Sequence, residues 1–261
     1  KRSIGGYLLR ALRLGALMLR AHLTMATRPP YKWPLYVDEY LIRYARGFQR
    51  SYFYHGSFRM RIDIFTTFGH FMNKTKDLPG DIAEFGVYRG ASSVAWAKNI
   101  KLMRMQGKMT LDKKIYGFDS FEGYPEPKAD EIAALNTSRK GKWGDTSLDG
   151  VQAYCNRMGV GDTVHLVKGF YPNSFKDFGH LKFSQVLIDC DLYDSHKAVL
   201  EYVYPRMVKG GIIFLAEYKE PRWPGATKAV EEFFMNKPEK IVQYPELMAV
   251  DQQLVAYVVK Q

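Results

Sequence analysis

The sequence predicts an α/β fold in which a mostly parallel sheet carries helices on both faces, behind an N-terminal helical extension. From residue 80 onward, short apolar runs alternate with helical stretches. These runs are rich in Val and Ile, as in strands that are buried on both faces of a parallel sheet. The 261 residues are 46% hydrophobic and 25% charged. That is enough for one large α/β domain, and it excludes wholesale disorder.

The expected elements follow one another in regular order. The predicted strands span residues 82–87, 114–118, 162–168, 183–188, 212–215 and 253–259. The predicted helices span residues 91–106, a stretch that begins at 147, 193–207 and 225–236. A polar insertion with Gly and Pro, residues 122–146, separates the second strand from the next helix. Long loops in compact domains are usually functional or disordered. We therefore expect a lid or substrate wall here, with Tyr124 and Trp143 as contacts, and a plain surface loop as the alternative.

The N-terminal segment carries almost all of the net charge of +11. Residues 1–62 hold twelve Lys or Arg and two acids, whereas residues 63–261 are close to neutral at +1. We place a domain boundary between these two parts. An aromatic stripe at helical spacing, which favours packing, lies within the basic part: Tyr36, Tyr40, Tyr44 and Phe48. The charge therefore bears on docking rather than on the chemistry of the body.

Residues 4–26 are apolar, but Arg10, Arg13 and Arg20 interrupt them. These charges argue against a membrane span and against a signal peptide. One alternative is a helix packed on the body or on a second subunit of a homo-oligomer. The other is a helix lying peripherally on an anionic membrane surface. The two cysteines, Cys155 and Cys190, exclude a disulfide scaffold and indicate a reducing, cytoplasmic compartment.

The carboxyl ends of the strands are where a parallel sheet binds ligands. Gly86 and Gly90 follow the first strand and permit a tight turn before a helix N-terminus. Their spacing matches neither G-x-G-x-x-G nor a P-loop, so simple turn glycines are an alternative. Asp119 ends the second strand, where dinucleotide folds commonly hold a ribose hydroxyl pair. Together these features favour a cofactor that contains adenosine.

Acidic residues follow the strand at 183–188. In extended geometry Asp189 and Asp191 point the same way, because the side-chain period of a strand is two. Such a pair can bind a hard cation or act as a base. Asp194 or Ser195 is expected to cap the next helix. The histidines of this part, His165, His180 and His196, show no ligand spacing and are interpreted as structural.

Four ordered motifs, residues 81–93, 118–125, 188–195 and 204–211, resemble the TylF/MycF (macrocin O-methyltransferase) family. The resemblance covers roughly residues 63–260. It implies a class I methyltransferase fold, which is Rossmann-like, with a seven-stranded sheet and a reversed last strand. It also implies S-adenosylmethionine as the methyl donor and a divalent metal, usually Mg²⁺. Known members methylate hydroxyls of sugars or phenolic groups on natural products.

The resemblance also assigns roles. Glu84, Gly86 and Gly90 would line the methionine end of the donor, and Asp119, with Ser120 beside it, would hold the ribose. Residues 145–147 would approach the adenine, with a helix cap at Thr146 and Asp149 as the alternative. Asp189 would be a metal ligand and Asp191 the general base. The complete expected cofactor set is Glu84, Phe85, Gly86, Val87, Tyr88, Arg89, Gly90, Ser92, Ser93, Asp119, Ser120, Thr146, Ser147, Gly169 and Asp189.

The next strand departs from the family pattern. Two adjacent aspartates usually follow it, but here the residues are Ala216 and Glu217. Ala216 cannot bind a metal, and Glu217 is one methylene longer than aspartate. Either Asp189, Glu217 and waters hold a weaker ion, or the metal role is lost.

The sequence thus predicts an O-methyltransferase that acts on a hydroxyl of a small molecule. The first alternative is a non-catalytic or metal-independent protein that binds S-adenosylmethionine. A nucleic-acid methyltransferase is a further alternative suggested by the basic segment. We expect no nucleic-acid partner, because the sequence shows no specificity motif near the site.

Overall fold

The computed structural model describes residues 58–127, 139–243 and 256–261. The chain divides into two compact units, residues 1–60 and 61–261, and the strands all belong to the second. The predictions for the N-terminal helix and the aromatic stripe lie outside the described residues. The middle of the insertion, residues 128–138, also lies outside them.

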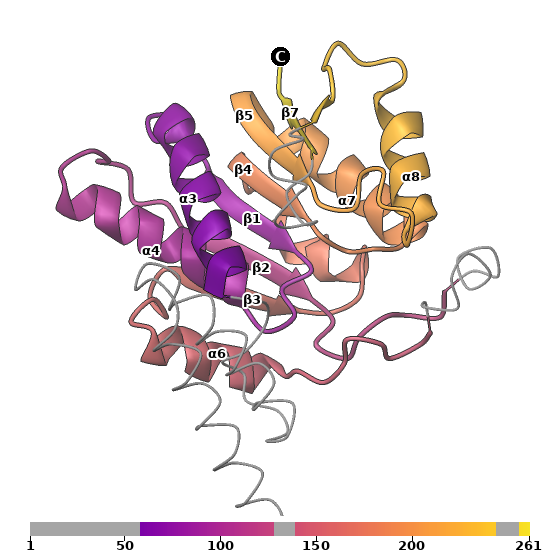
Figure 1. Ribbon diagram of the computed structural model, residues 1–261, viewed down its shortest axis with the longest axis horizontal. Helices are drawn as coiled ribbons and strands as arrows, with labels where there is room; N and C mark the ends of the chain where they lie inside the picture. Colours follow the sequence, from indigo (N-terminus) through magenta and orange to yellow (C-terminus); the bar gives the residue numbers. More distant parts are fainter. Residues whose placement is uncertain (1–57, 128–138, 244–255) are drawn as a thin grey trace, which may run out of the picture. The chain divides into compact units, whose positions relative to one another are not determined.

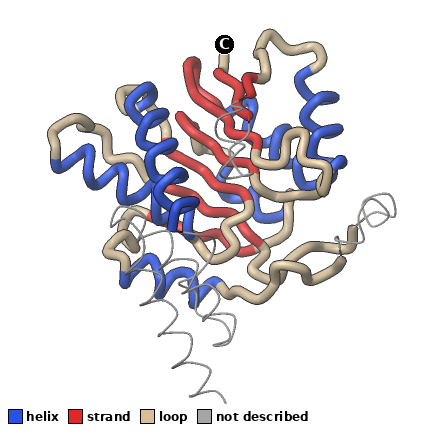
Figure 2. Tube along the Cα trace, in the orientation of Figure 1, coloured by secondary structure: helices blue, strands red, loops and turns tan. Residues whose placement is uncertain are grey.

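A seven-stranded sheet forms the centre of the second unit, with strand order β3-β2-β1-β4-β5-β7-β6 (Figures 1 and 2). The pairs among β1 to β5 are parallel, whereas β7 pairs antiparallel with both β5 and β6. The predicted mostly parallel sheet and its reversed last strand are therefore confirmed. The bounds are β1 Asp81–Phe85, β2 Ile115–Asp119, β3 Val164–Lys168, β4 Phe183–Ile188, β5 Met207–Leu215, β6 Val242–Gln243 and β7 Ala256–Val259.

The helices that follow the strands lie close to their predicted positions. Their bounds are α3 Phe58–Thr75, α4 Ala91–Met105, α6 Leu148–Arg157, α7 Tyr193–Val203 and α8 Pro224–Phe234, with 3-10 turns η2 Asn173–Phe178 and η3 Tyr204–Arg206. The helix expected over 193–207 ends earlier because Pro205 lacks the amide hydrogen that a helix interior needs. The chain then enters β5 at Met207, five residues before the predicted strand. The two-residue strand β6 was not predicted.

Large side chains cover both faces of the sheet. On one face, Phe68 of α3 stacks on Trp96 of α4, with ring centroids 3.9 Å apart, and both contact Phe214 of β5. On the other face, Val199 of α7 and Val230 of α8 belong to a buried hydrophobic cluster that also contains alternate side chains of the strands. Helices on both faces leave the carboxyl edge of the strands for ligands.

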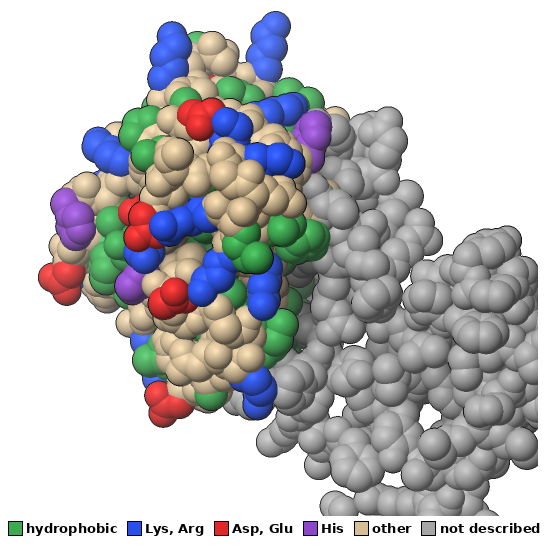
Figure 3. Space-filling model, turned by 90° about the vertical axis from the view of Figure 1, so that its left-hand side faces the viewer, with side chains coloured by type: hydrophobic (Ala, Val, Ile, Leu, Met, Phe, Trp, Pro, Cys, Tyr) green, Lys and Arg blue, Asp and Glu red, His purple; other side chains and the backbone are tan. Residues whose placement is uncertain are grey.

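The described surface agrees with a nearly neutral body. The face in Figure 3 carries Lys and Arg beside Asp and Glu, with hydrophobic side chains between them. Two ion pairs near the end of α4 are Lys101–Asp162 and Arg104–Asp112. Within the described ranges, no helix combines the length and the apolar character needed to cross a membrane.

Candidate active site

Backbone hydrogen bonds continue past the strand ends and align the loops that follow β1, β4 and β5. The amide of Asp189 donates to the carbonyl of Phe85 over 2.8 Å, and the amide of Ala216 donates to the carbonyl of Ile188 over 3.0 Å. The parallel ladder thereby brings the glycine turn, Asp189 and Glu217 to one edge of the sheet. The side chains of Phe85 and Val87 point into the core and are buried.

The predicted glycine turn is present between β1 and α4. Gly86 and Gly90 have φ values of 98° and 80°, a left-handed region that glycine adopts without steric cost. A Cβ atom on Gly86 would lie 1.7 Å from the carbonyl oxygen of Asp189. Only glycine fits there, so the turn passes directly against the loop that carries the acids.

Asp119 at the end of β2 holds this turn through the backbone. Its Oδ2 accepts hydrogen bonds from the amides of Val87 and Tyr88, both over 2.8 Å. Its Oδ1 accepts one from the amide of Phe121 over 2.7 Å. Burial raises the pKa of this carboxyl, and the amide bonds oppose that rise. Both lone-pair sites of Oδ2 are used, so a ribose would have to bind through Oδ1.

Glu84 supports the turn from below. Its side chain has no solvent exposure, and its two carboxylate oxygens accept hydrogen bonds from the hydroxyls of Ser92 and Ser93 in the first turn of α4. Burial raises its pKa to about 8, against the effect of both hydroxyls. Glu84 thus fixes the start of α4 on the sheet, and its expected place beside the methionine end of the donor stays a prediction.

Residues 145–147 attach to the same turn. The Thr146 hydroxyl donates to the Tyr88 carbonyl over 2.6 Å, and the Tyr88 hydroxyl donates to Asp145 over 2.8 Å. Arg89 forms an ion pair with Asp145. Ser147 is the N-cap of α6 and accepts from the amide of Gly150, so a cap exists here, although not at Thr146.

Two further predicted residues stabilise neighbouring loops. The amide of Gly169 donates to the carbonyl of Asp119 over 2.9 Å, which places the end of β3 beside the end of β2. The hydroxyl of Ser120 donates to the carbonyl of Gly123 over 2.7 Å and closes the turn after β2.

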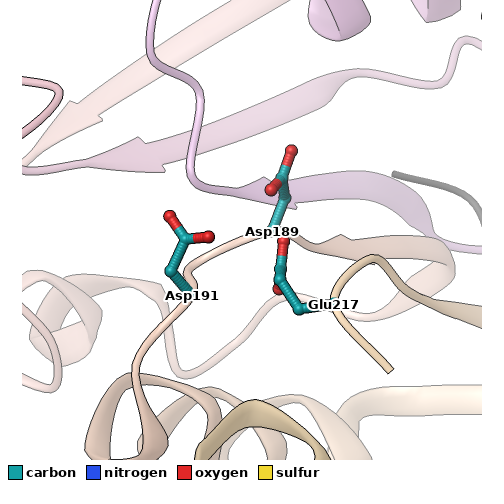
Figure 4. Close-up of side chains that lie close together, drawn as sticks. All are labelled: Asp189, Asp191 and Glu217. Carbon is teal, nitrogen blue, oxygen red and sulfur yellow. The ribbon is translucent and has the colours of Figure 1, made fainter. Parts of the chain in front are cut away.

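Three carboxyl groups converge at the ends of β4 and β5. Asp189, Asp191 and Glu217 each offer an oxygen atom within 4.8 Å of the others (Figure 4). The prediction that Asp189 and Asp191 point the same way assumed an extended strand, and that assumption was wrong. Strand β4 ends at Ile188, and Asp191 has a left-handed φ of 61°. The turn, rather than an extended strand, brings the two side chains together.

The electrostatics of this acid cluster favour an added cation or proton. Burial, and then the nearby Asp189, raises the pKa of Asp191 above its ordinary range. Burial, and then Asp191, raises the pKa of Glu217 in the same way. Among the described residues, no hydrogen bond of good geometry reaches the buried Glu217 Oε2, which lies beside the ring of His196. Hard oxygen ligands and negative charge together fit a divalent cation.

The departure at position 216 takes a definite form in the structure. Ala216 has no solvent exposure and lies in the core, whereas Glu217 reaches Asp189 and Asp191. Of these two positions, only Glu217 contributes a carboxylate to the cluster.

His196, which lies close to the acids in the sequence but was interpreted as structural, is a neighbour of the cluster. Its Nε2 lies 3.1 Å from Glu217 Oε2, and both side chains are buried. The helix cap was also predicted wrongly, because the N-cap of α7 is Leu192 and no side chain caps it. Asp194 and Ser195 lie inside the first turn. The sequence held no spacing signal for His196, since its partner Glu217 lies twenty-one residues further along the chain, in the loop after β5.

The described arms of the insertion pack over the acid cluster. The Tyr124 hydroxyl donates to Asp191 Oδ2, and Trp143 Nε1 donates to the Tyr124 hydroxyl over 3.0 Å. The Lys142 ammonium lies 4.5 Å from the ring centroid of Trp223, in the loop after β5. Trp143 remains 41% exposed. An aromatic wall made of Tyr124, Trp143 and Trp223 thus stands beside Asp191.

Comparisons with known proteins point to one family. The family described as "Macrocin-O-methyltransferase (TylF)" matches residues 59–258. A tetracenomycin rhamnosyl 4'-O-methyltransferase of Streptomyces olivaceus is 30% identical over 145 residues, 54% of each chain. Mycinamicin III 3''-O-methyltransferase of Micromonospora griseorubida is 28% identical over 162 residues, 60% of this chain and 61% of that protein. The matched part of the chain thus spans little more than half the length of these curated relatives.

Solved structures share the fold. The O-methyltransferase NovP superimposes with a TM-score of 0.63 at 20% identity, over 77% of this chain and 80% of that one. The calicheamicin methyltransferase CalS11 also gives a TM-score of 0.63, at 22% identity, over 99% of this chain and 94% of that one.

Proposed function

This chain belongs to the macrocin-O-methyltransferase (TylF) family, and on that premise we propose that it transfers the methyl group of S-adenosylmethionine to a hydroxyl of a small molecule. The observation that carries the proposal is the acid cluster of Asp189, Asp191 and Glu217 directly beside the glycine turn of Gly86. Methyl transfer needs a donor site and a proton acceptor next to each other, and this edge of the sheet offers both.

The donor would occupy the glycine turn. Gly86 and Gly90 let the backbone approach a ligand closely, and the N-terminus of α4 faces the same turn. Asp119 keeps the turn in shape through its three amide bonds, so its main contribution would be to preorganise the donor site. Asp145 and Thr146 would close the site from the side.

Mg²⁺ fits the acid cluster, with Asp189 and Glu217 as its protein ligands and Asp191 beside them. A bound divalent cation would lower the pKa of an acceptor hydroxyl. Asp191 would receive the acceptor proton, since its raised pKa is matched to proton uptake near neutral pH. The acceptor oxygen would form a bond to the methyl carbon as the carbon–sulfur bond breaks. The bonding electrons pass to sulfur, which leaves S-adenosylhomocysteine.

The acceptor would displace the Tyr124 hydroxyl from Asp191. Tyr124 occupies the oxygen that an acceptor hydroxyl needs, and the aromatic wall lies alongside it. Flat aromatic faces suit the apolar face of a sugar ring, and one curated relative is named for a rhamnosyl-bearing natural product. We therefore propose a sugar hydroxyl as the acceptor, with a phenol as the second class to test.

Residues 1–26 would dock on a second copy or an anionic membrane, as their composition suggests.

The test combines donor binding with turnover. Calorimetry with S-adenosylmethionine, with and without Mg²⁺, should show one donor site per chain. A screen of glycosylated natural products and phenols should then give methylated product whose formation slows on chelation of the metal. Donor binding without turnover on any acceptor would instead favour a non-catalytic binding protein. A rate that EDTA leaves unchanged would contradict the metal role.

A further inference from the structure

His196 lies in the first turn of α7 and is 1% exposed. Its Nδ1 is 3.2 Å from the carbonyl oxygen of Leu192 and 3.5 Å from the Cys190 sulfur. Its Nε2 is 3.1 Å from Glu217 Oε2. The ring therefore bridges the loop after β4 and the loop after β5, immediately behind the acid cluster.

The orientation of the ring follows from the chemistry of its partners. A carbonyl oxygen only accepts, so Nδ1 is the nitrogen that donates to Leu192. That bond turns Nε2 toward Glu217 Oε2, and a ring protonated on both nitrogens donates to this carboxylate as well as to Leu192. Close packing leaves the buried ring little room to rotate. Carboxylates that bind a metal are themselves hydrogen-bonded by groups outside the ligand set, which orient them.

Glu217 needs such support more than an aspartate would. Its side chain has one more rotatable bond, and each free rotor costs entropy when a ligand fixes it. One part of its carboxylate contacts the Asp189 side chain and the Asp191 backbone, which leaves Oε2 toward His196. With Ala216 in the core, Glu217 is the single acid that the loop after β5 brings to the cluster.

We propose that His196 is a positioning residue that holds Oε2 of Glu217 so that the rest of the carboxylate completes a divalent-cation site with Asp189, beside Asp191. The inference rests on the proposed metal role and adds to it a specific contact through which position 217 replaces the acid missing at 216. It also explains the buried imidazole, which the methyl-transfer chemistry does not use.

The test measures metal uptake directly rather than activity. Mn²⁺ is titrated into the metal-free full chain, and the free ion is followed by electron paramagnetic resonance. Wild type and His196→Gln, whose amide can still donate to Glu217, should bind one Mn²⁺ with affinities within about threefold. His196→Ala should bind about 10-fold to 100-fold more weakly. The matched control, His180→Ala at an exposed histidine, should equal wild type.

A double-mutant cycle separates positioning from general damage. In a Glu217→Gln background, His196→Ala should cause little further loss of Mn²⁺ affinity, because its partner is already altered. S-adenosylmethionine affinity serves as the check that each variant is folded. If His196→Ala does not fold, nitrogen NMR of the wild-type ring, assigned with His196→Gln, supplies the answer. The Nε2 resonance should then shift as Mg²⁺ is added.

The outcomes distinguish this inference from the proposed function. Wild-type uptake of Mn²⁺ together with equal affinity in His196→Ala overturns the positioning role alone, as does an Nε2 resonance that Mg²⁺ leaves unmoved. Absence of Mn²⁺ uptake by wild type overturns the metal role and the positioning role together, while donor binding and methyl transfer would still stand.

Discussion

The proposed donor side and the proposed acceptor side of this edge of the sheet are built in opposite ways. On the donor side, the acids are satisfied: Asp119 accepts three amide hydrogens, and both oxygens of Glu84 accept serine hydroxyls. On the acceptor side, Asp191 and Glu217 face other carboxyl groups, and the buried Glu217 Oε2 lies beside the ring of His196. The donor acids preserve a shape, whereas the crowded acceptor acids favour an added proton or cation.

The substitution expected to have the largest effect on the acceptor side is Asp191→Asn. The amide removes the proton acceptor but keeps the size of the side chain, so we expect turnover to fall about 10²-fold to 10⁴-fold. Donor affinity by calorimetry should stay within about threefold of wild type. Asp194→Asn, at an exposed acid three residues later, is the matched control and should retain full activity. Near-normal turnover of Asp191→Asn would remove the general-base assignment.

On the donor side, the corresponding change is Asp119→Asn. An amide nitrogen at Oδ2 cannot accept from Val87 and Tyr88, and an amide oxygen there leaves the Phe121 amide facing a donor. We expect a loss of about 1–3 kcal/mol in the free energy of unfolding. Donor affinity should weaken together with it. Denaturant unfolding and calorimetry measure the two effects. A variant that loses turnover while keeping both stability and donor affinity would contradict the shape-keeping role.

The raised pKa values predict how stability depends on pH. The unfolded acids ionise near pH 4, but Asp191 and Glu217 hold their protons to higher pH in the folded chain. The folded state then binds more protons than the unfolded state, so stability falls as the pH rises from about 4 toward neutrality. One group contributes at most about 1.4 kcal/mol per pH unit.

Thermal unfolding of the metal-free chain from pH 5 to pH 8 measures this slope. Glu217→Gln should flatten it, and Glu84, whose pKa is also raised to about 8, contributes equally to both proteins. Added Mg²⁺ should raise the melting temperature of wild type most strongly at the high end of this pH range. Equal slopes in wild type and Glu217→Gln would show that Glu217 does not contribute to the pH dependence of stability.

The smallest expected effect is that of Tyr124→Phe. Loss of the hydroxyl removes the bond to Asp191 but keeps the ring in the aromatic wall. A bond to a charged group contributes about 1.5–3 kcal/mol, part of which the acceptor hydroxyl would replace. We therefore expect a several-fold change in the KM for the acceptor with little change in donor affinity. Trp143→Phe, which removes the donor to Tyr124, should have a weaker effect in the same direction.

The sequence by itself determined the succession of strands and helices along the chain, the glycine turn and the acids at the strand ends. These features are local: apolar runs predict strands, and Gly86 and Gly90 mark a turn that other residues would strain. Even so, the local argument that Asp189 and Asp191 share a face assumed an extended chain, and the left-handed turn at Asp191 replaced it.

Only the tertiary structure decided what those acids contact. Glu217 joins Asp189 because β5 pairs beside β4, and His196 reaches Glu217 because α7 starts directly behind both loops. Tyr124 reaches Asp191 across sixty-seven residues through the folded insertion. Such contacts depend on strand order and loop packing, which no spacing within one segment encodes. The sequence thus determined which chemical groups lie at the strand ends, and the fold determined which of them accept hydrogen bonds from the backbone and serines and which lie against other carboxyl groups.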